Sequence, residues 1–536
     1  MELLRNCQAV TTDCYGDNMQ IKQLSIDMKR CLSDFNVEFH TLNQVSTTIL
    51  IGENGTGKST MMEAILEILL SFDSPATESK INYDYVFEYE YAQKDIHIAK
   101  SWHHYYIDVD GEVFEGSYSA VKNWLKGHRI FPKRIITFYS GANNKLEPQI
   151  RKINTEFKKQ YRTIMRGYLW VKNNVAQFAT SPIPVRKYNL CDEQMVPIYL
   201  CSILGGPSSY EKNYLIEQCG FDFIARFLMI VDLDKVEKLF GNKHFEGEYP
   251  HHLLQVAEYI DPEMCEYLRR GWLYASKNKG YFEIEELRDC GINPRNIMEF
   301  FQILQDLFDA EYETYVSIGN NVVTSGDLSE GQRQLIKMLG MLGICKNEDC
   351  LILLDEPDAH MNPQWKYGIK KIMDGCLEEA QNAQAIIATH DPLLVNGVPK
   401  EFIRIFENLE GRTIVHVPTE DTAGMGIDGL LQSQYYGLKS TLDIGTQDLL
   451  EEKRNLLVKR KAGYLSHDEQ LRLRYLTEIL ENMAFARNIP TDNYYDDFVA
   501  AVHEIYRNHT AVNLSLEEIE EKNRILREIA KGLIDV

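Results

Sequence analysis

The sequence lacks the paired cysteines of a metal site and any long apolar run. Its 11 cysteines are scattered, and no CxxC pair or histidine cluster accompanies even the nearest two, Cys345 and Cys350. This spacing argues against zinc and indicates reduced, buried thiols. No apolar run approaches the roughly 20 residues that span a bilayer, and the segment Met1–Cys7 has no signal-peptide core. We therefore expect a cytoplasmic protein without a membrane contact.

Basic residues are also fewer than acidic ones. Lys and Arg number 57 against 79 Asp and Glu, which gives a net charge of −22. A surface this acidic does not wrap nucleic acid, because phosphate contacts need basic side chains. Any contact with DNA or RNA should therefore be local or made through a partner. One stretch is basic, and we favour a solvated helix face over a nucleic-acid contact for its members Arg151, Lys152, Lys158, Lys159, Arg162 and Arg166.

The chain divides by pattern into four segments, as its length leads us to expect. Strand-type alternation dominates residues 1–150, including an antiparallel meander over Tyr85–Glu115 with buried aromatic side chains on one face. Residues 151–318 are predicted to form a mostly helical insertion without the sustained heptads of a coiled coil. Residues 319–430 return to alternating strands and helices, and residues 431–536 are helical and highly charged.

A glycine-rich loop follows an apolar strand and opens a helix. The strand is Thr48–Ile51 and the loop is Gly52–Ser59, which is the context that a phosphate-binding motif requires. Its glycines let successive N–H groups point at an anion, and the helix adds the positive end of its dipole. Lys58 can reach the β- and γ-phosphates, and the Ser59 hydroxyl can ligate Mg²⁺. The loop predicts a nucleoside-triphosphate site formed by Asn54, Gly55, Thr56, Gly57, Lys58, Ser59 and Thr60.

Two stretches in the second half of the chain suit the same site. The apolar strand Leu351–Leu354 ends in Asp355 and Glu356. Asp355 suits a Mg²⁺ ligand, and Glu356 next to it would polarise the attacking water. Upstream, Ser329 and Gly331 precede a helical pattern, where a hydroxyl and backbone N–H groups can meet a γ-phosphate.

These motifs resemble the ATP-binding-cassette ATPases, in their RecF/SMC-like branch. Walker A lies at 52–59, the signature motif at 328–332, Walker B at 351–356 and a D-loop region at 357–363. The resemblance implies an α/β ABC-type P-loop ATPase fold of two lobes with an antiparallel β subdomain, carrying the helical insertion and the helical C-terminal region. It also implies a Mg²⁺-dependent ATPase that acts as a head-to-tail homodimer or a larger oligomer.

The same resemblance assigns residues to roles. Glu356 and the switch histidine His390 are expected to be catalytic, Ser59 and Asp355 to hold Mg²⁺, and the signature residues to contact ATP, namely Ser329, Gly331 and Gln332. One element of the family pattern is missing. The glutamine expected after the strand that ends at Tyr139 has no counterpart in Ser140–Asn143, and Gln149 follows too late, so that role stays unassigned.

Within this branch, the run Glu356–Pro363, the total length and the charged helical C-terminal region resemble the PtuA-like ATPases of Septu and retron anti-phage systems. The resemblance implies an ATP-hydrolysing regulatory subunit that controls an HNH nuclease of the PtuB type. In retrons a reverse transcriptase with its msDNA joins the complex. Two alternatives remain open, a RecF/SMC-like DNA repair ATPase that binds DNA directly and a fused nuclease of the OLD type. The acidic charge balance argues against the first, and the dispersed charge of residues 431–536 argues against the second.

Overall fold

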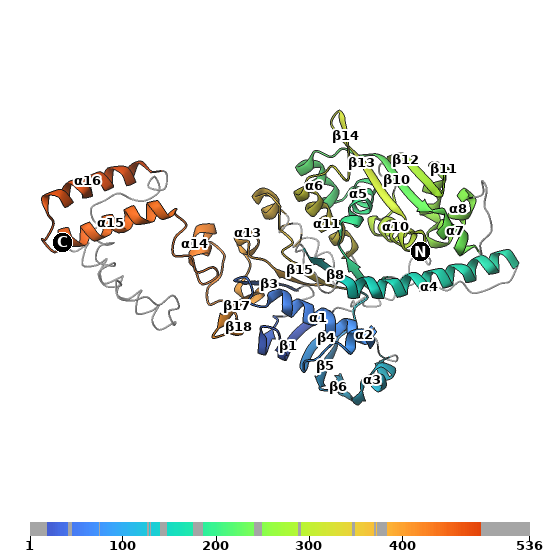
Figure 1. The fold of residues 1–536 in the computed structure, drawn as a ribbon, viewed down its shortest axis with the longest axis horizontal. Coiled ribbons are helices and arrows are strands. Elements are labelled where there is room, and N and C mark those ends of the chain that lie inside the picture. Colours follow the sequence, from blue (N-terminus) through green and yellow to red (C-terminus); the bar gives the residue numbers. More distant parts are fainter. Residues whose placement is uncertain are drawn as a thin grey trace, which may run out of the picture. The chain divides into compact units, whose positions relative to one another are not determined.

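The computed structural model describes residues 19–40, 46–73, 75–125, 128, 130–139, 147–174, 186–240, 249–287, 291–345, 349–368, 371, 373 and 383–483. By its internal contacts the chain separates into two compact units, Met1–Ala423 and Gly424–Val536. The first unit contains three sheets and the motifs identified above (Figure 1).

A seven-stranded sheet forms the centre of the first unit. Six of its strands are parallel, and only the edge strand β18 is antiparallel to its neighbour. In spatial order the strands are β18 (Arg412–His416), β17 (Ile403–Leu409), β3 (Ser46–Gly52), β16 (Ala383–Ala388), β15 (Cys350–Asp355), β8 (Arg134–Tyr139) and β9 (Tyr188–Leu190). β17 and β18 pair as an antiparallel hairpin over Gly411.

The register of the parallel strands brings four loops to one edge. Asp355 pairs with Ala388 on one side and with Tyr139 on the other, and Ala388 pairs with Leu50. The segments that follow β3, β16, β15 and β8 therefore leave the sheet side by side. Ligands of open α/β sheets bind at this carboxyl edge, and here it carries the phosphate loop and the strand that ends at Asp355.

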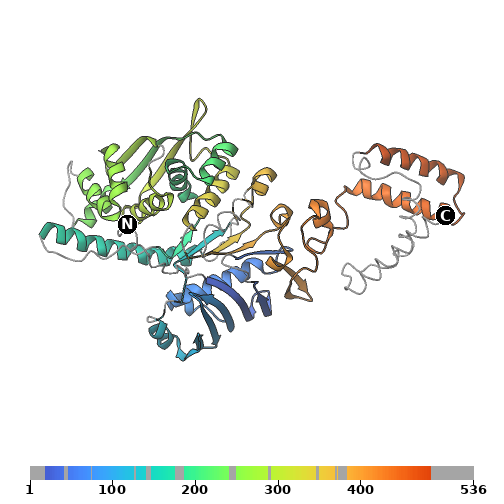
Figure 2. The ribbon, with the colours of Figure 1, turned by 180° about the vertical axis from the view of Figure 1, so that it is seen from behind.

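Both faces of the central sheet are buried, as in other parallel sheets. Leu351 and Leu353 of β15 belong to the core that includes α1 (Lys58–Asp73), whereas Ile352 and Leu354 belong to the core that includes α11 (Glu330–Cys345). The helices α1 and α11 accordingly lie on opposite faces of the sheet (Figures 1 and 2). A continuous apolar run such as β15 results from this two-sided burial.

A six-stranded antiparallel sheet covers the other side of α1. Eleven of the 16 residues of α1 are buried, because the helix lies between two sheets. The predicted meander is confirmed, and Tyr85, Phe87, Tyr89 and Tyr91 are core residues. In spatial order the strands are β2 (Leu32–Glu38), β1 (Met19–Lys29), β4 (Tyr85–Tyr91), β5 (Lys94–Ser101), β6 (His104–Val109) and β7 (Glu112–Ser117), and the short helices are α2 (Pro75–Glu78) and α3 (Tyr118–Leu125).

The insertion differs from the mostly helical segment that the sequence predicts. It contains a five-stranded antiparallel sheet, and its long helix α4 (Glu147–Asn174) begins before residue 151, so that the expected boundary falls inside a helix. The strands in order are β11 (Trp272–Ser276), β12 (Lys279–Leu287), β10 (Ile224–Asp232), β13 (Glu311–Ile318) and β14 (Asn321–Thr324). Its core is continuous with that of α11 and the central sheet.

Short helices surround this sheet (Figure 2). The apolar helix α5 (Val196–Gly205) is buried along its whole length and packs against α10 and α11. Other helical elements of the unit whose bounds the described residues give are η1 (Glu193–Met195), α6 (Tyr210–Cys219), α7 (Leu233–Leu239), α8 (Tyr249–Ile260), α9 (Pro262–Arg270), α10 (Pro294–Phe308), α13 (Pro392–Val395) and η2 (Lys400–Phe402).

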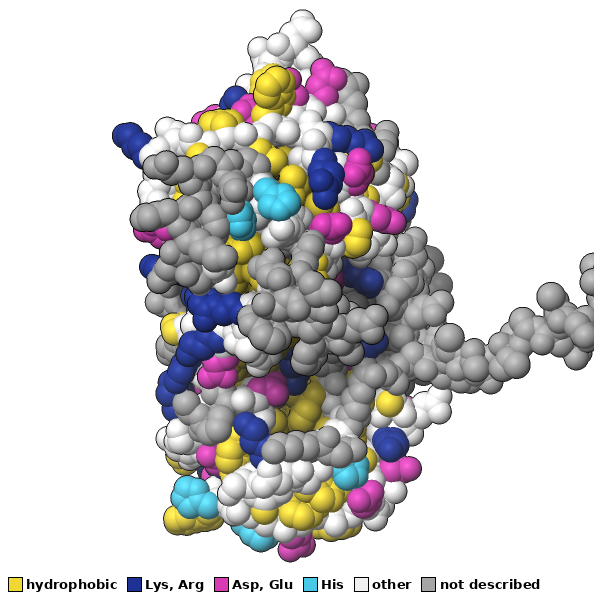
Figure 3. Space-filling model, turned by 90° about the vertical axis from the view of Figure 1, so that its right-hand side faces the viewer, with side chains coloured by type: hydrophobic (Ala, Val, Ile, Leu, Met, Phe, Trp, Pro, Cys, Tyr) yellow, Lys and Arg dark blue, Asp and Glu magenta, His cyan; other side chains and the backbone are white. Residues whose placement is uncertain are grey.

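The basic residues of α4 have structural partners. Arg151 pairs with Asp192 at 3.0 Å, Lys158 lies 3.4 Å from Asp306, and Arg166 donates to the carbonyl of Lys238. On the face of the unit shown in Figure 3, basic and acidic side chains of the described residues are interspersed. These residues of α4 therefore form ion pairs and hydrogen bonds with the rest of the insertion, in addition to facing solvent.

The second unit contains α14 (Gly426–Gln432), α15 (Ile444–Lys461) and α16 (His467–Asn482). A leucine cluster that includes Leu456, Leu457, Leu473 and Leu476 holds α15 against α16, and a Ser466–Glu469 capping box begins α16. Residues 484–536, the rest of the segment predicted to be helical, lie outside the described residues. Within the part of the chain that is described, no helix combines the length and apolarity needed to cross a bilayer.

Candidate nucleotide-binding site

The phosphate loop uses glycine where other residues would not fit. Gly52, Gly55 and Gly57 have φ values of 141°, 85° and 102°, in the region that favours glycine. A Cβ on Gly52 would lie 2.2 Å from the carbonyl oxygen of Phe406, and one on Gly57 would lie 2.6 Å from a methyl group of Leu32. Neighbouring strands thus pack directly onto the loop backbone and fix its curvature.

Lys58 curls back over the loop. Its Nζ donates to the carbonyl of Gly52 at 2.7 Å and to that of Glu53 at 3.1 Å. Burial lowers the pKa of Lys58, whereas the carboxylates of Glu356 and Asp355 raise it in part. The two carbonyls therefore accept hydrogen bonds from the Lys58 ammonium group. A phosphate could replace them as the acceptor, because a charged phosphate oxygen forms a stronger hydrogen bond than a neutral carbonyl.

Asp355 and Ser59 face each other at the mouth of the loop. The Ser59 hydroxyl donates a hydrogen bond to Asp355, which together with Lys58 lowers the pKa of that carboxyl, but burial is the larger effect and raises it. A hydroxyl and a carboxylate are hard oxygen donors of the kind that Mg²⁺ prefers alongside phosphate oxygens and water. The two residues therefore fit the ion. Among the described residues no group of three or more His, Cys, Asp or Glu could hold a metal.

Glu356 is held in an uncommon backbone conformation. Its φ is 52°, and its N–H donates to the carbonyl of Ala388 at 2.9 Å, which ties it to the end of β16. His390 follows Ala388 by two residues, and its Nδ1 lies 2.5 Å from the Glu356 carboxylate. Burial raises the pKa of Glu356, and His390 lowers it in part. The structure thus brings the two predicted catalytic residues together.

These side chains surround one cavity of about 340 Å³. Its lining consists of Asn54, Gly55, Gly57, Lys58, Ser59, Thr60, Tyr139, Asp355 and Glu356. Thr56 is buried beside it and contributes its hydroxyl to the carbonyl of Glu53. A glycine-rich loop, a cation and two carboxylates at the carboxyl edge of a parallel sheet can hold a triphosphate and position a water molecule.

The predicted signature residues begin α11 and do not line this cavity within the described part of the chain. The Ser329 hydroxyl and N–H both donate to Oε1 of Gln332, and the Gln332 N–H donates to the Ser329 hydroxyl at 3.3 Å. This reciprocal arrangement is a capping box. Gly331 lies against the D-loop region, where a Cβ would be 2.8 Å from the carbonyl oxygen of His360.

Two residues of the site were not predicted. Tyr139 lines the cavity from the end of β8, whereas its sequence pattern marks it only as the end of a strand. Thr413 of β18 donates through its hydroxyl to the carbonyl of Thr56 at 2.9 Å and so braces the loop. No local sequence pattern identifies Thr413, because only the pairing of β18 with β17, and of β17 with β3, brings it to the loop. The segment Ser140–Asn143 lies outside the described residues.

Two family models match the chain over the segments that build this site. The model described as "AAA ATPase domain" matches residues 19–188, and the model described as "AAA domain, putative AbiEii toxin, Type IV TA system" matches residues 278–396. The fold and the site therefore define an ATP-binding α/β P-loop ATPase.

Within that class, the chain is a distant homologue of ATPases from Septu and retron systems. It is 25% identical over 229 residues to the Septu protein PtuA of Bacillus mycoides (strain KBAB4), a match that spans 41% of this chain and 30% of that relative. It is 23% identical over 411 residues to the Retron Vc95 probable ATPase of Vibrio cholerae serotype O1 biovar El Tor, a match that spans 72% and 73% of the two chains.

Similar solved structures include an Smc head bound to the C-terminal winged-helix domain of ScpA and the recombination mediator protein RecF. The first has a TM-score of 0.34 and 15% identity, and covers 74% of this chain and 97% of the Smc head. The second has a TM-score of 0.34 and 14% identity, and covers 74% of this chain and 98% of RecF.

Proposed function

We propose that this chain is a Mg²⁺-dependent ATPase subunit of a Septu-like or retron-like anti-phage complex, in which its nucleotide state controls a partner HNH nuclease of the PtuB type. The observation that carries the proposal is the convergence of Lys58, Ser59, Asp355 and Glu356 around one cavity. The two distant relatives support the class of complex.

In this proposal each group has a defined task. The loop N–H groups and Lys58 bind the β- and γ-phosphates, and Ser59 and Asp355 hold Mg²⁺, which screens phosphate charge when bound. Glu356 accepts a proton from the attacking water, and His390 orients Glu356 through the contact at 2.5 Å. Burial raises the pKa of Glu356. The raised pKa lies closer to neutral pH, and a general base is most effective when its pKa is near the working pH.

We further propose that two copies pair head to tail, so that Ser329, Gly331 and Gln332 of one copy complete the site of the other. In support, these residues lie outside the cavity formed by their own chain in the described structure. Lys58→Ala and Ser329→Arg chains should each be inactive alone, whereas a mixture should regain part of the ATPase activity through one composite site.

The mixture has a matched control, a Lys58→Ala chain combined with a Lys58→Ala/Ser329→Arg chain, in which no intact composite site can form. Restored hydrolysis in the first mixture and none in the control supports pairing. Full wild-type activity in a sample that stays monomeric with ATP contradicts it.

Control of a nuclease requires a docking surface for the partner. We propose residues 431–536 or the insertion, because among their described residues none contributes to the cavity around Lys58. The test is to reconstitute the chain with its HNH partner, and with a reverse transcriptase and msDNA where these are encoded beside it. Nuclease activity should differ between ATP, a non-hydrolysable analogue and the Glu356→Gln variant. A nuclease rate that is the same in all three states contradicts the proposal.

A further inference from the structure

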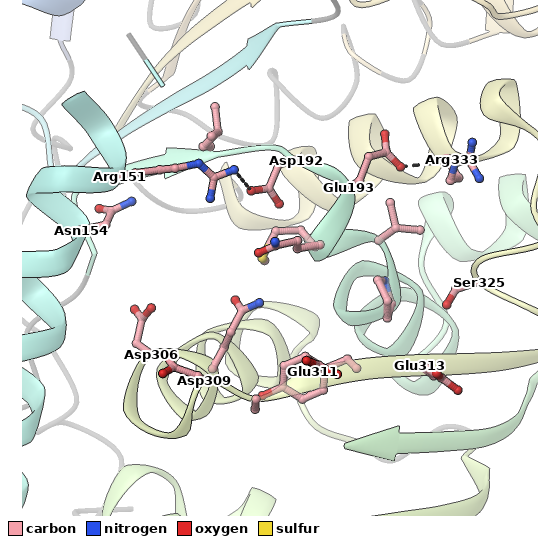
Figure 4. A pocket seen from close by; sticks show the side chains of 18 of the residues that line it. Arg151, Asn154, Asp192, Glu193, Asp306, Asp309, Glu311, Glu313, Ser325 and Arg333 are labelled. Atoms are coloured by element: carbon pink, nitrogen blue, oxygen red, sulfur yellow. Dashed lines mark hydrogen bonds and ion pairs between the residues drawn. The ribbon is translucent and has the colours of Figure 1, made fainter. Parts of the chain in front are cut away.

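The long helix α4 has two faces that differ in how their cations are used. One face packs on the rest of the insertion, where α4 contacts α7, α10 and β9 (Figures 1 and 2). On this side Arg151 pairs with Asp192, as Figure 4 shows, and Lys158 lies 3.4 Å from Asp306. The cations of the packed face therefore serve the structure of the insertion itself.

The opposite face of α4 carries a line of cations. Lys152, Lys159 and Arg166 follow one another at intervals of seven residues, which is about two helical turns, so they lie along one side of the helix. All three side chains are exposed, and the half-buried Arg162 lies beside them. At about 1.5 Å per residue the line is about 21 Å long. These four residues, Lys152, Lys159, Arg162 and Arg166, are called the cationic row below.

The cationic row lacks counter-charges. Among the described residues, the side chains of Lys152, Lys159 and Arg162 have no hydrogen-bond or ion-pair partner. Arg166 donates to the carbonyl of Lys238, which is neutral and leaves the charge in place. The other exposed residues of this face include one carboxylate, and they are Thr155, Glu156, Gln160, Thr163 and Gly167. In a chain with 57 basic and 79 acidic residues, this face therefore reverses the overall charge.

A row of unpaired cations on an exposed helix fits a polyanion with repeated charges. The phosphate backbone of a nucleic acid is such a polyanion, and Lys and Arg are the side chains that neutralise it. Contacts to phosphate fix the position of a protein on a nucleic acid but carry no sequence information. We propose that the cationic row binds the phosphate backbone of a nucleic acid duplex without reading its bases. The sequence alone favours a solvated face here, because it does not show which of the cations are paired.

The charge of the rest of the chain determines what kind of binding to expect. A net charge of −22 repels a nucleic acid everywhere except at such a local row. We therefore expect binding that is confined to α4 and that weakens steeply as salt is added. None of the four side chains lines the described cavity around Lys58. The inference goes beyond the proposed function, because this chain would hold the nucleic acid itself and would do so without hydrolysing ATP.

The probe is a fluorescein-labelled DNA duplex of mixed sequence, measured by anisotropy on the full chain at low salt. The triple variant Lys152→Gln/Lys159→Gln/Arg162→Gln should weaken binding by about tenfold or more. It should also reduce the slope of log K against log salt by about 2.7, because each lost contact to B-DNA removes about 0.9. A second duplex of unrelated sequence should bind as the first does.

A matched control separates the row from the net charge. The variant Lys80→Gln/Lys94→Gln/Lys439→Gln removes the same number of charges at exposed positions outside α4. It should weaken duplex binding by less than about threefold and leave the salt slope nearly unchanged, because no phosphate contact is lost. Melting temperatures of both triple variants check that the fold is retained.

A variant that gains binding cannot be explained by misfolding. Glu156→Lys replaces the carboxylate of this face by a further cation, so duplex binding should tighten by about threefold or more. Glu285→Lys changes the net charge by the same amount at an exposed position on β12. It should tighten binding clearly less than Glu156→Lys does.

No binding of the duplex at low salt, equal effects of the two triple variants, or unchanged binding in Glu156→Lys overturns the inference. Polyglutamate that displaces the duplex as well as unlabelled duplex does, at equal charge concentration, also overturns it in favour of an acidic protein partner. ATP hydrolysis is measured on the same samples. Normal hydrolysis with duplex binding that ignores the row contradicts this inference alone, and row-dependent binding in a chain that hydrolyses no ATP contradicts the proposed function alone.

Discussion

The carboxylates at the end of β15 lie where burial opposes their charge. Burial raises the pKa of both Asp355 and Glu356, and the partners present, Lys58, Ser59 and His390, offset this only in part. In the free chain their ionised forms are therefore less stable in the folded than in the unfolded state. A bound cation with phosphate would reverse this balance, so the site is pre-arranged for its ligand at the expense of stability.

Asp355→Asn should consequently stabilise the free protein at neutral pH. The folded pKa of Asp355 is raised, so the stability gained by neutralising it is largest above that pKa. The gain should shrink as the pH falls through the folded pKa, and vanish below the unfolded value of about 3.9. Melting curves from pH 4 to 8 test this.

The same melting curves, repeated with nucleotide, provide a control. Mg²⁺·ATP at about 100 times its dissociation constant should stabilise the wild type by about 2.7 kcal/mol, and Asp355→Asn by much less. An Asp355→Asn chain that is less stable than the wild type without ligand, at every pH, contradicts the account.

Residues of the site differ in how far the sequence could predict them. Lys58, Ser59 and Asp355 belong to local patterns at a strand end, and the cavity confirms that they meet. Thr413 could not be predicted, because its contact with Thr56 spans 357 residues. Ser329 was expected to offer its hydroxyl to phosphate, but in the described chain that hydroxyl takes part in a helix cap. The spacing of Ser329 and Gln332 is itself the sequence pattern of a capping box, so two uses of the same hydroxyl fit the sequence and only the structure distinguishes them.

At the scale of elements, one ion-pair network joins the segments that follow β15 and β16. Lys366 lies 3.4 Å from Asp358 and 2.5 Å from Asp391, and Asp358 is only 2% exposed. Thr389 also donates to Asp358 at 2.9 Å. Because Glu356 precedes this network and His390 lies between two of its members, the network fixes the segments that carry these two residues, which are predicted to be catalytic.

Lys366→Met should therefore destabilise the first unit by on the order of 3 kcal/mol, since it leaves a buried carboxylate without its cation. ATP hydrolysis should fall as well, because the segments around Glu356 and His390 lose a restraint. Urea unfolding measures the first effect, with the exposed Lys439→Met as the matched control.

The double variant Lys366→Met/Asp358→Asn separates charge from packing. It should recover much of the lost stability, because the amide keeps an acceptor for Thr389 without a charge. A double variant no more stable than Lys366→Met would show that Asp358 is not the reason for the loss.

Elements with local signals were predicted well, and those built from distant pairings were not. The hairpin at Asp110–Gly111 and the meander over β4 to β7 follow from turn residues and alternation. The sheet of the insertion was missed because its central strand β10 is a short apolar run that suits a buried helix equally well. Its partner β13 lies more than 80 residues further on, and no sequence periodicity marks such a pairing.

At the scale of the whole molecule, the separation of the chain at Ala423 and Gly424 predicts that the first unit folds by itself. A chain that ends at Ala423 should bind ATP and melt within about 4 °C of the first transition of the full chain. Calorimetry with and without nucleotide tests this. Loss of cooperative melting in the shortened chain would show that the second unit is needed for the fold of the first.

The most direct test of the account compares the wild-type chain with Glu356→Gln, both purified without partners. ATP binding, ATP hydrolysis and cleavage of DNA and RNA are measured on the same samples with Mg²⁺. Loss of a general base typically lowers a rate by roughly 10²–10⁴-fold, so the variant should bind ATP as the wild type does but hydrolyse it at least that much more slowly. Neither chain should cut nucleic acid. Hydrolysis by Glu356→Gln at the wild-type rate, or nuclease activity of the lone wild-type chain, would contradict the account.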